Sequence, residues 1–366
     1  MKHRVGLIGC FGSVASARKL LPDCCELAGL CDIREDLLAR CRAEDAGVFC
    51  TNDFRELARR GDIDSVVTFT PNATHRDIAV AMLEGGKNVF IEKPMGITLE
   101  EGRSILDAER RSGRHVAVDL EMRALGMGPL VRQIIDSGEI GRVVQFDHDH
   151  HRGGWLRTRP SGDYRTRRAT SGLFKMEGIH NLDLARYLVG EIMAVQCFSA
   201  PAVLPQYEFP DNVTAILWFE GGAMGRYTTS HTRCGYSAGH DDAEAIRCGH
   251  MKFWSIVGTE GSMWIDGWTQ RLTIFRFVAD PPGTDSLKPE FSRRLDYSSR
   301  PHPHNWFHDM AGNRRLFLER MAAGRPHIQS AADAFRSELV AYAADEASMQ
   351  CGTRIDLAEF DARHGG

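Results

Sequence analysis

The tripeptide Glu92-Lys93-Pro94 is the part of this sequence best suited to chemistry. It follows residues 88–91, a short apolar run with the composition of a buried strand. A lysine at the end of such a strand is partly removed from water, which lowers the pKa of its ammonium group toward neutrality. A lysine of that kind can transfer a proton at neutral pH, whereas a solvated surface lysine cannot do so usefully. Lys93 is therefore a candidate proton-transfer residue.

A glycine-rich turn near the N-terminus indicates dinucleotide binding. The strand expected at 5–8 runs into Gly9-Cys10-Phe11-Gly12-Ser13-Val14-Ala15, an imperfect G-x-G-x-x-G pattern in which Phe11 replaces the second glycine. Glycines let the backbone approach a pyrophosphate at the N-terminus of the next helix. Asp32 ends the next expected strand, 20 residues after Gly12. Its carboxylate can bind both ribose hydroxyls and repel a 2′-phosphate, so the pattern favours NAD over NADP.

The elements that position these residues alternate between strands and helices. Strands are expected at 5–8, 27–31, 65–70, 88–91 and 115–120, and helices at 16–21, 35–46, 74–84 and 99–111. Thr98 and Glu101 have the spacing of a capping box for the last helix. This alternation predicts an α/β Rossmann domain with a parallel sheet over residues 1–122. Because ligands bind beyond the carboxyl ends of parallel strands, we expect four polar residues to lie around the glycine turn: Asn72, His75, Glu92 and Lys93.

Beyond residue 122 the pattern changes to an α+β domain over residues 123–366. Helices are expected at 129–136, 306–322 and 331–349, and strands at 143–150, 213–219, 225–229, 252–257, 262–265 and 272–277. These strands predict one large open-faced, mainly antiparallel sheet. Helices would cover one face, and the other face would be available to a neighbouring subunit.

The sequence resembles the glucose–fructose oxidoreductase / inositol dehydrogenase (Gfo/Idh/MocA) family over nearly its whole length. The residues that support the resemblance are Gly9–Ala15, Asp32, Thr70-Pro71-Asn72 with His75, Glu92-Lys93-Pro94, Gly178-Ile179-His180 with Asp183, 257–262 and 324–346. The resemblance implies a cis Lys93–Pro94 peptide and a homodimer or homotetramer formed through the C-terminal sheet. It also implies an NAD site made by Gly9, Phe11, Gly12, Ser13, Val14, Asp32, Thr70, Asn72, His75, Glu92 and Lys93.

The family pattern also implies a catalytic histidine, His180, which faces Lys93 across a cleft. An aspartate four residues earlier usually accompanies this histidine, but here the position is Met176. Glu177 shares the same helical face, because it lies three residues before His180, and could replace the aspartate or form only a salt bridge or cap. Asp183 would support the site from behind.

Arg123, His150, Arg152 and Asp183 are the candidate substrate-binding residues. His148 and His150 lie on one face of the expected strand and His151 on the other, so hydrogen bonding to substrate hydroxyls is favoured and no metal site is expected. Downstream, residues 151–168 contain six arginines: Arg152, Arg157, Arg159, Arg165, Arg167 and Arg168. These fit either an anionic substrate such as a sugar acid, or an arm or solvated loop.

Composition excludes several classes of protein. The 366 residues include 45 Lys and Arg against 49 Asp and Glu, a net charge of −4, which disfavours nucleic acid as a partner. No apolar run is long enough to cross a membrane, and we expect no signal peptide. The ten cysteines include no Cys-x-x-Cys pair, which favours reduced thiols and a cytoplasmic location.

Three functions stay open at this stage. The first is reversible, NAD-dependent oxidation of a secondary alcohol on a sugar or cyclitol, with Lys93 or His180 accepting the hydroxyl proton. The second is a glycosidase or lyase that uses NAD to form a transient keto-sugar, as some relatives do. The third is an NAD-sensing regulator without catalysis, which the presence of both Lys93 and His180 argues against.

Overall fold

The computed structural model describes residues 1–9, 12–152, 162–232, 250–298 and 306–365, and these form two compact units. The first unit comprises residues 1–124 and 310–338, and the second comprises 125–309 and 339–366. The sequence predicted one boundary, after residue 122, and assigned everything beyond it to the second domain. The structure differs in the segment 310–338, which packs with the first unit.

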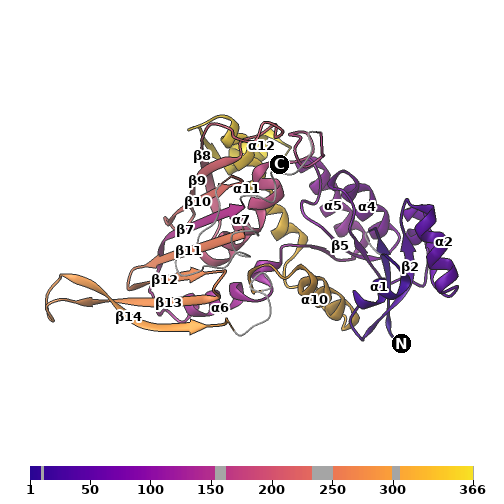
Figure 1. The fold of residues 1–366 in the computed structure, drawn as a ribbon, viewed down its shortest axis with the longest axis horizontal. Coiled ribbons are helices and arrows are strands. Elements are labelled where there is room, and N and C mark those ends of the chain that lie inside the picture. The colour runs from indigo at the N-terminus through magenta and orange to yellow at the C-terminus, as the bar shows by residue number, and fades with distance from the viewer. Residues whose placement is uncertain (10–11, 153–161, 233–249, 299–305, 366) are drawn as a thin grey trace. The chain divides into compact units, whose positions relative to one another are not determined.

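A parallel six-stranded sheet forms the centre of the first unit (Figure 1). Its strands in spatial order are β3 (Phe49–Thr51), β2 (Cys25–Cys31), β1 (His3–Ile8), β4 (Ser65–Thr68), β5 (Asn88–Ile91) and β6 (Val116–Val118). All five predicted strands are present, and β3 extends the sheet beyond β2. This parallel arrangement confirms the predicted Rossmann fold.

Helices connect these strands. They are α1 (Val14–Lys19), α2 (Glu35–Glu44), α3 (Phe54–Arg59), η1 (Asn72–Thr74), α4 (His75–Glu84), α5 (Leu99–Ser112), η2 (Glu121–Arg123) and α10 (Met310–Ala322). Helix α10 contacts β2, β4 and β5, and its Phe317, Leu318 and Met321 join the same buried cluster as Leu7 and Phe90. This apolar packing explains why α10 belongs to the first unit.

The second unit contains a nine-stranded, mainly antiparallel sheet (Figure 1). Its strands in spatial order are β14 (Leu287–Asp296), β13 (Arg271–Ala279), β12 (Gly261–Asp266), β11 (His250–Gly258), β7 (Val143–Arg152), β10 (Met224–Ser230), β9 (Asn212–Phe219), β8 (Ile192–Ser199) and β15 (Arg354–Asp356). Among the described strands of this second sheet, only β7 and β10 pair in parallel. The predicted α+β sheet is therefore confirmed.

One face of this sheet is buried and the other is exposed. Buried and half-buried residues alternate along β9, whose Val213, Ala215 and Leu217 point inward. The helices of this unit are α6 (Met127–Asp136), the π-helical turn η4 (Phe174–Gly178), α7 (Ile179–Val189) and α12 (Leu357–Arg363). Helix α11 (Ala331–Met349) begins in the first unit and ends in the second.

Two further observations concern the described part of the chain. None of its helices is both long and apolar enough to span a membrane. Its cysteines are all free thiols: Cys24, Cys25, Cys31, Cys41, Cys50, Cys197 and Cys351.

Candidate functional site

The turn after β1 requires glycine at its first position. Gly9 has φ of +77°, and a Cβ atom there would lie 2.9 Å from the carbonyl oxygen of Phe69. A side chain would therefore be strained and would push β1 away from the segment after β4. Gly12 leaves open space, since its nearest neighbour would be 4.0 Å from an added Cβ. Cys10 and Phe11, a predicted cofactor contact, lie outside the described residues.

The first turn of α1 binds a carboxylate. Ser13 is its N-cap and accepts a hydrogen bond from the amide of Ser16. The amides of Val14 and Ala15 donate to the two carboxylate oxygens of Glu44 at 2.9 and 2.8 Å. These amides therefore point toward an anion-binding position, which the Glu44 carboxylate occupies and in which a pyrophosphate would replace it. The residues present fit a dinucleotide here.

Asp32 lies at the carboxyl end of β2, where the adenosine ribose of a dinucleotide is expected. It is buried, and its Oδ1 accepts hydrogen bonds from the Arg34 amide and Nε at 3.0 and 3.2 Å. Nη2 of Arg34 donates to Oδ2 at 3.3 Å. The arginine thus fixes the carboxylate in one orientation at the edge of the predicted NAD site.

His75 links the ends of two strands rather than pointing into open space. It is fully buried, and its Nε2 lies 2.9 Å from the Thr70 carbonyl oxygen and its Nδ1 2.7 Å from that of Pro94. Burial lowers the pKa of the imidazole. Both ring nitrogens thus face backbone carbonyl oxygens, and the one N–H of the neutral ring can donate to either the segment after β4 or the segment after β5. Thr70 and Asn72 are half-buried beside it.

Lys93 lies beyond the carboxyl end of β5, within the same unit as Gly9 and Asp32, and is half-buried. The Lys93–Pro94 peptide is cis, as the resemblance implied. Burial raises the pKa of Glu92, while the adjacent Lys93 lowers it. The position of this strand end follows from the parallel sheet, as predicted.

Acidic groups that no sequence motif indicates lie beside Glu92. Asp119 follows β6, is buried, and accepts a hydrogen bond from Asn313 of α10 at 2.9 Å. Burial raises its pKa well above the usual value, and Glu92 and Glu121 add to that effect. Arg314 lowers the pKa of both Asp119 and Glu92. The strand end 115–120 was predicted, but Asp119 and Glu121 lacked a motif that would have singled them out.

Arg123, a predicted substrate contact, forms an ion pair with Asp333 of α11 in the first unit. Its side chain is 11% exposed. The pairing leaves its role toward substrate as a prediction.

In the second unit, η4 and α7 contain the predicted catalytic pair. Glu177 lies in the π-helical turn, and His180 lies in the first turn of α7; both are buried. The π-helical geometry means that Glu177 and His180 do not follow the spacing of an ordinary α-helix. The His180 ring makes an edge contact with His308, with 4.7 Å between ring centroids. Asp183 is buried beside Arg186, 3.9 Å away, on the same helix.

The buried face of the sheet presents an aromatic and polar row. His148 stacks between Tyr227 and Trp254, and burial lowers its pKa to about 3. His150 shares this face as predicted, with Nδ1 3.3 Å from the hydroxyl of Tyr227.

Two residues that the sequence analysis missed extend this row. Asn181 of α7 donates to the Tyr227 hydroxyl at 2.9 Å, and Lys252 is buried opposite His150 in the strand register. The register between strands reveals Lys252 and the packing of α7 on the sheet reveals Asn181, and one sequence provides neither. Arg152 ends β7, but its side chain lies outside the described part.

The arginine-rich segment is described only in part. Arg165 lies 4.0 Å from Asp163, and its guanidinium stacks on Tyr164. The amide of Arg168 donates to Glu208 at 2.9 Å. Arg157 and Arg159 lie outside the described residues, so an anionic ligand for this segment stays a prediction.

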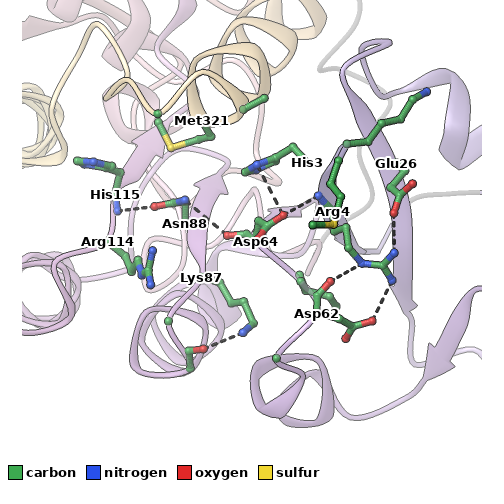
Figure 2. A pocket seen from close by; sticks show the side chains of 18 of the residues that line it. His3, Arg4, Glu26, Asp62, Asp64, Lys87, Asn88, Arg114, His115 and Met321 are labelled. Atoms are coloured by element: carbon green, nitrogen blue, oxygen red, sulfur yellow. Dashed lines mark hydrogen bonds and ion pairs between the residues drawn. The ribbon is translucent and has the colours of Figure 1, made fainter.

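The first unit also has a cavity of about 1090 Å³ at the opposite edge of its sheet, where the strands begin (Figure 2). Its charged groups face one another: Arg4 pairs with Glu26 at 2.5 Å and with Asp62 at 2.9 Å. Lys87 donates to the Gly85 carbonyl at the C-terminus of α4, at 2.8 Å. Cations are favoured at that end of a helix. This cavity lies at the amino ends of the strands, whereas a dinucleotide binds at the carboxyl ends, so it is not the expected cofactor site despite its size.

The fold and the strand ends of the first unit define a dinucleotide-binding Rossmann protein. Residues 3–120 match the model of the oxidoreductase family with an NAD-binding Rossmann fold, and residues 130–264 match the GFO/IDH/MocA C-terminal domain. The chain therefore belongs to the Gfo/Idh/MocA family of oxidoreductases, and its cofactor is NAD.

Individual relatives agree with this assignment. scyllo-Inositol 2-dehydrogenase (NAD(+)) of Bacillus subtilis (strain 168) is 30% identical over 250 residues, which cover 67% of each chain. Inositol 2-dehydrogenase 2 of Saccharopolyspora erythraea is 28% identical over 230 residues, covering 61% of this chain and 65% of that protein. The alignments thus span about two thirds of these relatives. The structure of a levoglucosan dehydrogenase with NADH has a TM-score of 0.74 at 22% identity, covering 98% of this chain and 99% of that one.

Proposed function

We propose that this protein is an NAD-dependent dehydrogenase that oxidises a secondary alcohol of a sugar or cyclitol. The observation that supports this most strongly is the position of Lys93. It follows β5, while Gly9 follows β1 and Asp32 follows β2, all at the carboxyl edge of one parallel sheet. This is the edge at which a dinucleotide binds.

In the proposed reaction the substrate carbon loses a hydride and its hydroxyl loses a proton. NAD, when bound, supplies the hydride acceptor, and Gly9, Gly12, Ser13, Val14 and Asp32 would hold it. Lys93 or His180 would accept the hydroxyl proton, which leaves a ketone. Glu92, next to Lys93, is a largely buried carboxyl whose pKa is raised by burial and lowered by the adjacent lysine.

The substrate class is proposed from the relatives, whose names include inositol and levoglucosan dehydrogenases. The test is to incubate the purified protein and NAD with scyllo-inositol, myo-inositol, levoglucosan and a sugar acid, and to follow NADH absorbance. NADH formed in equal amount to the ketone supports the proposal. NAD binding without turnover on the whole panel would contradict it and favour a sensing protein.

One observation favours a second candidate, elimination through a transient keto-sugar. Met176 lies four residues before His180, where the resemblance leads us to expect an aspartate, so proton transfer at His180 differs from the usual arrangement. A keto group acidifies the neighbouring C–H bond and permits loss of a glycosidic leaving group, after which the hydride returns to carbon. Product formed from a glycoside without net NADH would identify this reaction.

We also propose that the exposed face of the large sheet binds a second copy of the chain. Large apolar side chains are exposed there: Phe198 by 47%, Met224 by 49% and Trp264 by 66%. Near them Arg226 donates to both carboxylate oxygens of Asp149, at 2.7 and 3.0 Å. An apolar surface with a paired charge at its centre is typical of an interface between subunits.

The free thiols fit a reducing compartment, and we place the protein in the cytoplasm.

A further inference from the structure

The backbone that follows Lys93 is fixed by a carboxylate from a distant part of the chain. The amide of Met95, two residues after Lys93, donates to Oε1 of Glu338 in α11. Glu338 is fully buried, and its other oxygen has no hydrogen-bond partner among the described residues. Such a group is costly to bury, because a buried acceptor gives up hydration that one hydrogen bond replaces only in part.

Two other helices hold the same loop. His75 of α4 contacts the carbonyl of Pro94 at 2.7 Å, and Glu101 of α5 accepts the amide of Ile97 at 2.7 Å. The polar backbone groups on both sides of Met95 are thus held from α4 and α5. Glu338 binds the amide of the same Pro94–Met95 peptide from a helix that lies 243 residues away in sequence.

A second carboxylate of α11 holds the start of the segment that contains Glu177 and His180. Asp345 is half-buried, and its Oδ1 and Oδ2 accept the amides of Phe174 and Lys175 at 2.8 and 3.1 Å. A Cβ atom at Gly172 would overlap this carboxylate, so the close approach requires glycine there. Asp345 therefore anchors the first turn of η4 within the second unit.

Glu338 and Asp345 are seven residues apart, which is two turns of an α-helix, so they share one face of α11. We infer that α11 is a positioning element, in which Glu338 orients the Lys93 loop and Asp345 orients the helix that contains His180. The catalytic part of this inference rests on the proposed function. The two hydrogen-bonding contacts do not.

The chemistry of Glu338 agrees with a positioning role. Burial raises the pKa of its carboxyl to about 8, although the Met95 amide lowers it. An apolar side chain of similar size is usually the more stable choice at a buried position of this kind. A carboxyl that lowers stability yet fixes the amide beside Lys93 is expected where function, rather than packing, determines the residue.

The test for Glu338 compares Glu338→Gln with Glu338→Met. Glutamine keeps an oxygen that can accept the Met95 amide, whereas methionine fills the space without an acceptor. Glu346→Gln is the matched control, because Glu346 lies on the same helix and its carboxylate contacts Arg363, at 3.3 Å.

Hydrogen–deuterium exchange of the Met95 amide, measured on the protein without NAD or substrate, is the first readout. We expect about tenfold or faster exchange in Glu338→Met, and wild-type exchange in Glu338→Gln and Glu346→Gln. Wild-type exchange in Glu338→Met would overturn the inference. If that variant does not fold, the exchange rate of the Met95 amide in the wild-type protein is the test. Fast, unprotected exchange there would contradict the contact with Glu338.

Kinetics on any substrate that the wild type oxidises are the second readout. Displacing Lys93 should lower kcat about 10- to 100-fold in Glu338→Met and leave the KM for NAD within about threefold, while Glu338→Gln restores kcat. Equal kcat in Glu338→Met and wild type would contradict a positioning role. If the wild type oxidises nothing, the proposed function fails while the exchange result still stands.

The Asp345 contact has an independent test. Asp345→Leu removes both acceptors, and Gly172→Ala displaces the carboxylate without changing it. We expect both variants to expose the amides of Phe174 and Lys175 to about tenfold faster exchange, whereas Met95 exchanges as in wild type. Protection retained in both folded variants would overturn this half of the inference.

Discussion

At the residue scale, the pairing of Asp32 with Arg34 determines how the protein should choose its cofactor. The carboxylate accepts three hydrogen bonds from Arg34 and lies at the end of β2. With Asp32 present, a 2′-phosphate meets a negative charge. Without it, the guanidinium of Arg34 loses that carboxylate and can bind a phosphate instead.

We therefore expect Asp32→Ala to weaken NAD binding about 10-fold or more and to strengthen NADP binding. The magnitude is that of hydrogen bonds to a charged group, about 1.5–3 kcal/mol. Titration of both cofactors by calorimetry measures the two Kd values. An unchanged NAD to NADP ratio would show that Asp32 does not contact the ribose, and Asp32→Ala with Arg34→Ala separates the two side chains.

Single residues could be predicted where a local pattern requires them. Gly9, Asp32 and Lys93 each follow a strand of the parallel sheet, so their position at its carboxyl edge could be predicted, while their roles stay predictions. Asp119, Asn181 and Lys252 were missed because their neighbours come from other strands or helices. His75 was predicted as a cofactor contact, yet both its nitrogens face backbone carbonyls, and no spacing in the sequence reveals that.

At the element scale, α11 contains a buried carboxyl, Glu338, that lowers the stability of the protein at neutral pH while it binds the Met95 amide. The carboxyl of Glu338 has a pKa of about 8 in the folded protein against an ordinary value of 4.5. Between these two pH values the unfolded chain releases a proton that the folded protein keeps. The contribution of this group to stability is therefore full below about pH 4.5 and is lost as the pH rises toward 8.

We expect Glu338→Gln to gain stability relative to wild type as the pH increases from 5 to 9. Each pKa unit corresponds to about 1.4 kcal/mol, so the relative free energy of unfolding should rise by about 2–4 kcal/mol over this range. Urea unfolding at pH 5, 7 and 9 measures it. A difference that does not change with pH would show that Glu338 ionises normally, and Glu346→Gln is the control.

Most elements of both units could be predicted from periodicity and end signals. Thr98 caps α5 as expected, but Glu101 reaches the amide of Ile97 rather than that of Thr98. Strands β3, β8, β14 and β15 were not predicted. Strands β3 and β15 are only three residues long, and β14 is exposed along nearly its whole length, so these three lack an alternating apolar pattern. The π-helical turn was missed because hydrophobic periodicity does not distinguish it from an α-helix over five residues.

At the scale of the whole molecule, the exposed face of the large sheet should determine the oligomeric state. Trp264→Glu places a charge at the most exposed of its apolar residues. We expect this variant to shift the protein toward monomer in light scattering after gel filtration, while Ile33→Glu on the first unit has no effect. A monomeric wild-type protein, or an oligomer that tolerates the charge, would refute the proposed interface.

The return of residues 310–338 to the first unit was not predicted. The helix over 306–322 was predicted, but a helix pattern does not specify which core will bury it. Phe317, Leu318 and Met321 pack in the core of the first unit, and α10 contacts β4 and β5. Both sheets have an apolar face, so the sequence alone does not show which of the two sheets α10 covers. Chain order alone therefore placed this segment in the wrong unit.

The central claim is that Lys93 transfers the substrate proton. Lys93→Ala tests it most directly, with NAD affinity and turnover measured on the same preparation. We expect a Kd for NAD within about threefold of wild type and a kcat that falls about 10²- to 10⁴-fold. Turnover close to wild type, with NAD still bound, would contradict the claim.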